Sequence, residues 1–263
     1  MTMIYSLTMA RKIVITSGKG GVGKTTLAVL IARRLAETGK RTLVIDMDLS
    51  LNNLDVVSGV EDKINYCLED VISGKCRVKQ ALVKVCDNFS VLQSSHSFDN
   101  IVSGQNVKLL MDGLNDIFDY IFIDCPAGVD LGFHRAVSCA DEAIVVINAY
   151  PSSVRDADKV VNLLKSYKLK SVVAIVNRLR KDLVSKGRSM NEYECEEILK
   201  VPVIAALEDD DAVLCSDGGK LKGLSKTRSA VNKLVKKIEK KDYVSAVEGL
   251  NDKYRKIKGR LSA

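Results

Sequence analysis

The chain has 263 residues, of which 46% are hydrophobic and 28% are charged. These values are those of a soluble globular protein that is long enough for one large α/β domain with a well-buried core. No run of about 18 apolar residues occurs, which excludes a membrane-spanning helix, and the N-terminus lacks the pattern of a signal peptide.

The net charge of +7 is unevenly distributed along the chain. Residues 220–263 contain 14 Lys and Arg against 4 Asp and Glu, whereas the residues before them contain 26 against 29. A basic tail on a nearly neutral body indicates either an anionic partner or a solvated helix face. The seven Cys residues are scattered and never spaced Cys-x-x-Cys. Reduced cytosolic thiols therefore explain them better than disulfides or a metal site.

Apolar strand-like runs alternate with helical patterns from the N-terminus onward. In chain order the strands are expected at residues 12–16, 41–46, 89–93, 120–125, 142–148, 171–177 and 201–205. The helices are expected at residues 24–38, 106–117, 153–167, 191–199 and 229–241. Strands this apolar, separated by helices, are typical of an α/β fold with a mostly parallel sheet and helices on both faces.

A glycine-rich loop directly follows the first apolar run, Ile13–Ile15. Residues 18–26 read Gly-Lys-Gly-Gly-Val-Gly-Lys-Thr-Thr and fit the phosphate-binding pattern Gly-x-x-x-x-Gly-Lys-Thr between a strand and a helix. Lys24 is expected to reach the β- and γ-phosphates, and the Thr25 hydroxyl to bind Mg²⁺. Backbone N–H groups and the helix N-terminus complete an anion site. The residues expected to contact the nucleotide are Gly20, Gly21, Val22, Gly23, Lys24, Thr25 and Thr26.

This motif predicts a single-domain P-loop NTPase fold that binds a nucleoside triphosphate with Mg²⁺, and the resemblance given below implies that the nucleotide is ATP. We expect residues 11–245 to form the ATPase domain, residues 1–10 a loose N-terminal extension and residues 246–263 a basic amphipathic tail.

Three carboxylates follow two of the expected strands. Asp46 and Asp48 come after Leu43–Ile45, and Asp124 follows Tyr120–Ile123. Ligands of an open parallel sheet bind beyond the carboxyl ends of its strands, so these side chains and the loop should converge. Asp124 is expected to hold Mg²⁺ directly or through water, and Asp48 to orient the attacking water. The metal site is therefore expected at Thr25, Asp48 and Asp124, although a single Asp at a strand end can also be a simple turn or helix cap.

The loop carries a second lysine, Lys19, and in this the chain resembles the deviant-Walker ATPases, most closely the MinD family that places the division site of bacteria. The matching stretches are residues 44–48, 53–55, 124–128, 140–143 and 151–158, within a similarity that covers about residues 11–219. The stretch Pro-Ser-Ser-Val-Arg-Asp-Ala-Asp at residues 151–158 is the most specific of them.

The resemblance implies further roles. Lys19 would cross the interface of an ATP-dependent homodimer and contact the partner's nucleotide. Asn177 would read adenine, and the helix that contains Asp156 would meet division-inhibitor and activator proteins of the MinC and MinE type. The implied catalytic residues are Lys19, Lys24, Asp48 and Asp124. Ser50 and Asn52 depart from the Gly and Arg frequent in the family, and Ala206–Asp209 departs from Ile-Pro-Glu-Asp. These departures leave partner and base contacts open there.

The tail has an apolar stripe with basic flanks. Leu250, Tyr254, Ile257 and Leu261 recur at helical spacing among Lys and Arg residues. As MinD-like proteins end in such a helix, the resemblance implies that Leu250–Ala263 binds an anionic membrane surface when ATP dimerises the protein. The protein would then be cytoplasmic and peripheral on the inner face of the cell membrane. A soluble packing helix is the alternative.

Related ATPases have other functions, each with its own sequence requirement. A partition-type ATPase would bind DNA through the basic tail, and a flagellar-number ATPase would bind membrane in the same way as MinD. A reductase or cluster carrier would need paired cysteines, whereas Cys125 and Cys139 are single. The stretch at Ser152–Asp158 and the apolar stripe favour the MinD type, so nucleic acid is the less favoured partner.

Overall fold

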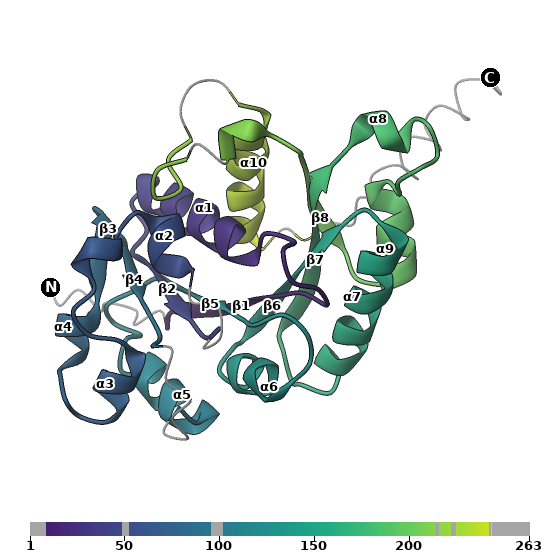
Figure 1. Ribbon diagram of the computed structural model, residues 1–263. Coiled ribbons are helices and arrows are strands. Elements are labelled where there is room, and N and C mark those ends of the chain that lie inside the picture. Colours follow the sequence, from purple (N-terminus) through teal and green to yellow (C-terminus); the bar gives the residue numbers. More distant parts are fainter. Residues whose placement is uncertain are drawn as a thin grey trace, which may run out of the picture.

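Eight strands form one sheet through the middle of the molecule (Figure 1). The computed structural model describes residues 9–48, 53–95, 102–213, 216–221, 225–241 and 243. In sheet order the strands are β3 (Val83–Cys86), β4 (Phe89–Leu92), β2 (Thr42–Asp46), β5 (Tyr120–Asp124), β1 (Arg11–Thr16), β6 (Glu142–Asn148), β7 (Ser171–Leu179) and β8 (Val203–Glu208). All neighbouring pairs are parallel except β3–β4. The predicted fold class is confirmed.

Helices cover both faces of this sheet (Figure 1). They are α1 (Lys24–Glu37), α2 (Leu54–Ser58), α3 (Leu68–Ile72), α4 (Val78–Ala81), α5 (Gly104–Asp112), α6 (Leu131–Ser138), α7 (Pro151–Leu164), α8 (Lys181–Val184), α9 (Glu192–Leu199) and α10 (Lys226–Lys240), with 3₁₀ turns η1 (Glu61–Lys63) and η2 (Asp211–Val213). One hydrophobic cluster joins the sheet to α1, α2 and α10. The other joins it to α3, α5, α6, α7 and α9.

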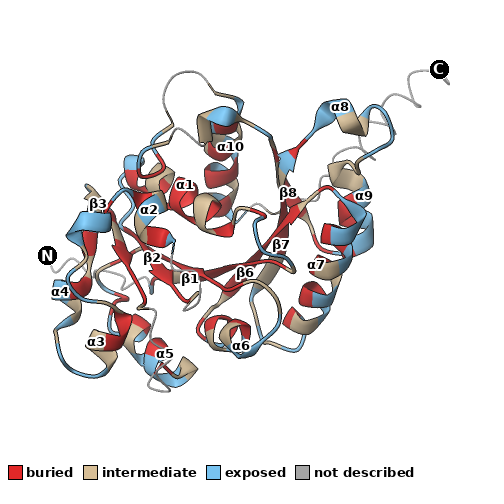
Figure 2. Ribbon diagram, in the orientation of Figure 1, coloured by how far each residue is buried: buried red, intermediate tan, exposed pale blue. Residues whose placement is uncertain are grey.

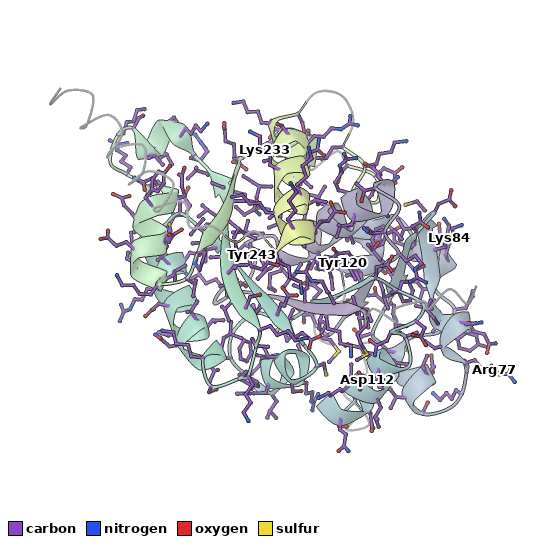
Figure 3. The ribbon with its side chains drawn as sticks, turned by 180° about the vertical axis from the view of Figure 1, so that it is seen from behind. Arg77, Lys84, Asp112, Tyr120, Lys233 and Tyr243 are labelled. Carbon is purple, nitrogen blue, oxygen red and sulfur yellow. The ribbon has the colours of Figure 1, made fainter. Side chains whose placement is uncertain are left out.

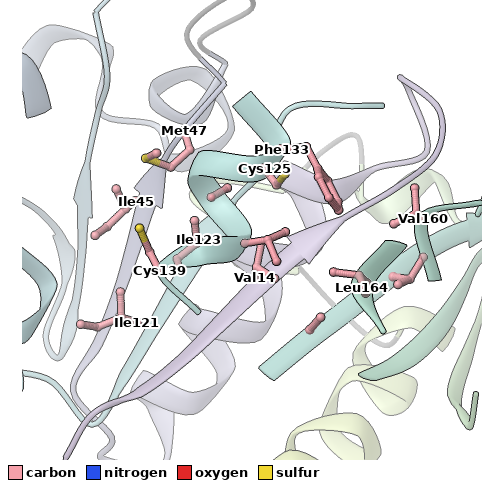
Figure 4. Packing of buried hydrophobic residues seen from close by; sticks show 14 of the residues in the cluster. Val14, Ile45, Met47, Ile121, Ile123, Cys125, Phe133, Cys139, Val160 and Leu164 are labelled. Carbon is pink, nitrogen blue, oxygen red and sulfur yellow. The ribbon is translucent and has the colours of Figure 1, made fainter. Parts of the chain in front are cut away.

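The central strands are apolar on both sides because both faces are covered. Along β1, Ile13 and Ile15 pack toward α1 and α10, and Val14 packs into the opposite cluster. Figure 4 shows Val14 in this second cluster with Phe133 of α6 and Leu164 of α7. The sheet is accordingly the most buried part of the molecule (Figure 2). Burying such side chains contributes about 1.5–3 kcal/mol each, so alternating polar residues would destabilise these strands.

Several element boundaries differ from the prediction. Strand β3 was not expected, because only Val83 of its four residues is buried and this antiparallel edge strand lacks the apolar run that indicated the other strands. Helix α5 begins two residues earlier than expected because the Ser103 side chain accepts a hydrogen bond from the backbone N–H of Asn106 and caps the helix. Helix α10 begins at Lys226 for the same reason, with Ser225 accepting from Arg228 N–H.

The end of the described chain is fixed to the amino-terminal edge of the sheet. Arg11 donates two hydrogen bonds of 2.7 Å to Glu142, and a third of 2.7 Å to the Tyr243 hydroxyl. That hydroxyl donates to Glu142 at 2.9 Å (Tyr243 is labelled in Figure 3). The tail, residues 246–263, lies outside the described residues, as do residues 1–8, so the predicted domain boundaries stay predictions. Within the described ranges, no helix is both long and apolar enough to cross a bilayer.

Candidate nucleotide site

The phosphate loop connects β1 to α1 at the carboxyl edge of the sheet. Gly23 precedes the first helical residue with a φ of 98°, a left-handed conformation that favours glycine. A Cβ atom there would also lie 2.5 Å from the Asn177 side-chain amide. That amide donates a hydrogen bond of 2.8 Å to the carbonyl of Val22. The first residue of α1, Lys24, is buried. The loop is therefore hydrogen-bonded to β7 on one side, and the side chain of Lys24 is buried.

Gly18 begins the loop for a different reason. Its φ is not positive, but a Cβ atom would lie 2.4 Å from the backbone carbon of Asp156 and 2.7 Å from the nitrogen of Ala157. Helix α7 thus packs its backbone directly on the loop.

We expect Gly18→Ala to lower the free energy of unfolding by about 1–3 kcal/mol, because overpacking against backbone cannot be relieved by a rotamer change. Thermal or urea unfolding without nucleotide measures it. Gly20→Ala is the matched control, since a Cβ atom at Gly20 meets nothing within 4 Å. Equal stability of the two variants would contradict the close packing of α7.

The predicted carboxylates do converge. Asp46 and Asp124 are register partners on the adjacent strands β2 and β5. Asp124 accepts a hydrogen bond of 2.5 Å from the Thr25 hydroxyl. Complete burial raises the pKa of Asp124 to about 6, with a further increase from Asp48, although Thr25 and Lys24 act in the opposite direction. Burial and the neighbouring Asp124 also raise the pKa of Asp46.

These residues fit a magnesium ion. The Oδ1 atom of Asp124 is buried and has no hydrogen-bond partner among the described residues. A cation would satisfy this oxygen and offset the repulsion between the carboxylates, which otherwise favours protonation. The neighbouring Thr25 hydroxyl supplies a second oxygen, the ligand type that Mg²⁺ prefers. In the described ranges, no group of three or more His, Cys, Asp or Glu side chains is arranged to hold a metal ion. Binding of Mg²⁺ here would therefore also need the Thr25 hydroxyl and the phosphates of the nucleotide.

Asp48 is brought to the same place by Asp46. The backbone N–H of Asp48 donates a hydrogen bond of 2.8 Å to Asp46 Oδ1, and Gln93 donates one of 3.3 Å to the other oxygen of Asp46. Because Asp46 is the register partner of Asp124, the first of these bonds holds the Asp48 backbone next to the Asp46–Asp124 pair. Ser50 and Asn52, which depart from the family pattern, lie outside the described residues.

The side chain of Lys19 is exposed, whereas that of Lys24 is buried. The Nζ atom of Lys19 donates a hydrogen bond of 3.1 Å to the hydroxyl of Ser152 near the start of α7. The second lysine of the loop therefore lies on the surface beside the Ser152–Asp158 stretch. Both features were predicted separately from the sequence, but their contact was not, since the two residues are 133 positions apart.

A cavity of about 230 Å³ adjoins the phosphate loop on the β7–β8 side. Gly23, Thr26 and Asn177 line it together with Asp209 and other residues of the segment that follows β8. The predicted base-reading residue thus lies between the loop and a cavity. Sequence reasoning missed Arg178, which lines the same cavity and has a left-handed φ of 53°. Such backbone in a residue other than glycine is uncommon and often marks a functional position.

Comparisons with known proteins agree with this geometry. Residues 10–176 match the family described as AAA domain. The chain is 42% identical over 211 residues to a putative septum site-determining protein MinD of Guillardia theta, covering 79% of this chain and 78% of that protein. The chain belongs to the MinD family. It is accordingly an ATPase of the septum site-determining proteins.

Solved structures of MinD proteins have the same fold. MinD in the MinC:MinD cell division protein complex of Aquifex aeolicus superposes with a TM-score of 0.77 at 36% identity, covering 88% of this chain and 96% of that one. Pyrococcus horikoshii MinD complexed with Mg-ADP superposes with a TM-score of 0.79 at 30% identity, covering 88% and 97%. These matches favour the MinD type over the partition-type and flagellar-number alternatives.

The cysteine at the site is a packing residue in this member of the MinD family. Cys125 follows Asp124 directly, and burial raises the pKa of its thiol to about 12. A neutral buried thiol is neither a nucleophile nor a metal ligand.

Gly128, three residues after Cys125, has a φ of 94° and donates its N–H to the carbonyl of Ser17 at 3.2 Å. This bond ties the segment after β5 to the phosphate loop.

Proposed function

We propose that the chain is an ATP-driven switch of division-site placement, which binds Mg-ATP at residues 20–26 and changes its partners with the nucleotide. The observation that carries this proposal is the pairing of Thr25 with Asp124. One oxygen of a fully buried carboxylate accepts from the Thr25 hydroxyl, and the other has no hydrogen-bond partner among the described side chains. Lys24 is buried close enough to lower the pKa of that carboxylate.

Each residue of the site has a defined task in this proposal. The N–H groups of residues 20–26 and Lys24 bind the phosphates, and Thr25, Asp48 and Asp124 hold the metal. Bound Mg²⁺ supplies charge neutralisation at the β- and γ-phosphates. Asp48, exposed in part and tethered through Asp46, orients the attacking water. Asn177 positions the base from β7, with its own carbonyl held by the Asn148 amide at 3.0 Å.

We further propose that the ATP-bound form is a homodimer in which Lys19 contacts the partner's nucleotide. In support, Lys19 is exposed and engages Ser152, whereas Lys24 already serves the phosphates of its own chain.

Lys19→Ala is expected to bind ATP with an affinity within about threefold of the original chain, yet to remain a monomer and lose stimulated hydrolysis. Completion of such a site in trans is typically worth about 10³–10⁵ in rate. Light scattering with ATP and Mg²⁺ measures the dimer. Ser152→Ala is the control, since it removes the contact of Lys19 but keeps the cation. A normal dimer of Lys19→Ala would refute the trans role.

The surface of α7 is the proposed docking site for regulatory proteins. A MinD relative has been solved as a MinC:MinD complex. In this chain Asp156 lies half-buried on α7, beside exposed Arg155 and Lys159, and its backbone touches Gly18. Partners of the MinC and MinE type that bind near Asp156 would therefore touch the element that packs on the phosphate loop. This geometry supports a link between partner binding and nucleotide state.

We propose that residues 250–263 anchor the ATP dimer to an anionic membrane, so that the protein is peripheral on the inner face of the cell membrane. Each Lys or Arg near such a surface contributes about 1 kcal/mol. Folding the tail costs about 1–2 kcal/mol per residue. The membrane affinity of one tail is therefore low, and the two tails of a dimer bind more tightly because the second tail binds at a high effective concentration. Tyr243, seven residues before Leu250 in the sequence, is hydrogen-bonded to Arg11 and Glu142.

Deleting residues 250–263 is expected to abolish ATP-dependent sedimentation with anionic liposomes and to leave the binding of ATP unchanged, since the residues that line the nucleotide site end at Thr227. Ile257→Glu should reduce the sedimentation more than Lys256→Gln does, because burial of the apolar side chain is not screened by salt. Capture by duplex DNA in place of liposomes would support the partition-type alternative, and normal liposome binding by Ile257→Glu would refute the amphipathic tail.

A further inference from the structure

Two asparagines lie next to each other toward the carboxyl ends of β6 and β7. Asn148 and Asn177 are register partners on these neighbouring parallel strands (Figure 1). Two residues earlier on each strand, Val146 and Ile175 belong to the hydrophobic cluster that contains α1. Because side chains alternate along a strand, both asparagines are on the side of the sheet where α1 and the phosphate loop lie. The pair therefore adjoins the nucleotide site.

The side chain of Asn148 holds the backbone of Asn177. Asn148 is the last residue of β6, and its Nδ2 atom donates a hydrogen bond of 3.0 Å to the carbonyl of Asn177. That carbonyl lies in the peptide plane that joins Asn177 to Arg178, and Arg178 has a left-handed φ of 53°. The register of β7 with β8 shifts at the same place, between Val176 and Leu179. A left-handed residue other than glycine persists only where its surroundings fix it, and the bond from Asn148 is one such restraint.

The side chain of Asn177 extends from this point to the phosphate loop. Its Nδ2 atom donates a hydrogen bond of 2.8 Å to the carbonyl of Val22, and the residue lines the cavity of about 230 Å³ beside the loop. Because Nδ2 donates to the loop, Oδ1 is the acceptor that this side chain can offer to a base. The 6-amino group of adenine can donate to such an acceptor, whereas the 6-carbonyl of guanine cannot. The orientation of the Asn177 amide would therefore favour adenine.

The contacts of Asn148 continue into the first turn of α7. The backbone N–H of Asn148 donates a hydrogen bond of 3.1 Å to the hydroxyl of Ser153, which is a buried residue of this turn. The preceding residue, Ser152, accepts the hydrogen bond from Lys19 of the phosphate loop. Two consecutive serines of α7 thus bind the end of β6 and the loop, so this turn contacts both sides of the nucleotide site.

We propose that Asn148 is a positioning residue for the nucleotide base. It acts through Asn177: it fixes the peptide plane that follows this residue, and thereby the direction in which the side-chain amide presents its acceptor. Ser153 fixes Asn148 in turn, so the first turn of α7 contributes to base recognition as well as to the contact of Lys19. The inference rests on the base-positioning role proposed above for Asn177.

The test compares the dissociation constants of Mg-ATP and Mg-GTP for the full-length protein, measured by competition with a fluorescent ATP analogue. Asn148→Ala should weaken ATP binding about tenfold, the effect of one lost hydrogen bond, and GTP binding less than about twofold. Asn148→Leu, which keeps the volume of the side chain but not its amide, should behave in the same way. Ser153→Ala should change the ratio in the same direction by a smaller factor. Asn106→Ala, at an exposed position of α5, is the control and should bind both nucleotides normally.

A double variant separates positioning of the base from general support of the fold. If Asn148 acts through Asn177, adding Asn148→Ala to Asn177→Ala should cause no further loss of ATP affinity. Additive losses, equal weakening of ATP and GTP by Asn148→Ala, or unchanged ATP binding by both Asn148 variants would each overturn the proposal. The ratio of the two constants does not depend on the folded fraction, so a less stable variant still gives an answer.

The single variant Asn177→Ala distinguishes this inference from the function on which it rests. If Asn177→Ala lowers the preference for ATP over GTP and the Asn148 variants do not, only the positioning role of Asn148 is wrong. If Asn177→Ala leaves that preference unchanged, the base-positioning role of Asn177 is wrong, and the role of Asn148 with it.

Discussion

Lys24→Ala is expected to reduce ATP hydrolysis by about 10²–10³-fold and to weaken ATP binding by at least about tenfold, because a buried charge-assisted contact to the phosphates is lost. A second effect adds to the first. Lys24 lowers the pKa of Asp124 in the folded protein, so its removal lets that carboxylate keep its proton to higher pH and weakens the metal site.

Phosphate release and the fluorescence of a labelled ATP analogue measure these two effects. Lys40→Ala, an exposed lysine just beyond the end of α1, is the matched control and should leave both unchanged. Hydrolysis by Lys24→Ala at the rate of the control would show that the phosphates bind elsewhere.

Asp124→Asn is expected to stabilise the nucleotide-free protein while it abolishes Mg²⁺-dependent hydrolysis. The pKa of Asp124 is about 6 in the folded state, against an ordinary value of 3.8. Between these values the folded chain binds more protons than the unfolded chain, so the free energy of unfolding falls as the pH rises from about 4 to about 6. Above pH 6 the charged, buried carboxylate costs a constant amount, about 2–3 kcal/mol.

Urea unfolding of nucleotide-free protein at several pH values measures this difference. Asp124→Asn should exceed the original chain in stability at pH 7.5 and equal it below about pH 4. Asp116→Asn, which removes an exposed carboxylate and keeps Asp124, should follow the pH dependence of the original chain. Addition of Mg-ATP should stabilise the Asp124→Asn variant less than the original chain, because the variant keeps Lys24 and the phosphate loop but loses a ligand of the metal. If Asp124→Asn were less stable than the original chain at pH 7.5, the buried charge of Asp124 would not destabilise the nucleotide-free protein, and the proposed reason for its raised pKa would be wrong.

The two variants together separate the parts of the site. Lys24 acts on the phosphates, so its loss impairs binding with and without metal, whereas Asp124 acts on the metal, so its loss impairs only what Mg²⁺ promotes. The hydrogen bond from Thr25 links the two, because Thr25 follows Lys24 directly and donates to Asp124.

The amino-acid sequence by itself determined the phosphate loop, the order of the main strands and helices, and the fold class. These properties depend on short spacings: an apolar run before the glycines, the Gly-Lys-Thr sequence at the start of a helix, and helical or strand periodicity over 5 to 15 residues. Such patterns involve residues that are close together in the sequence, so they can be recognised without knowledge of the fold. The edge strand β3 was missed because only one of its four residues is buried, and the starts of α5 and α10 were missed because their caps, Ser103 and Ser225, precede the apolar periodicity on which the prediction depended.

Only the tertiary structure decided which distant residues meet. The register of β2 against β5 places Asp46 beside Asp124, and a shift by one residue would turn one carboxylate to the other face. The close approach of α7 explains Gly18 and brings Ser152 to Lys19, and the length of β7 carries Asn177 to the carbonyl of Val22, 155 residues away.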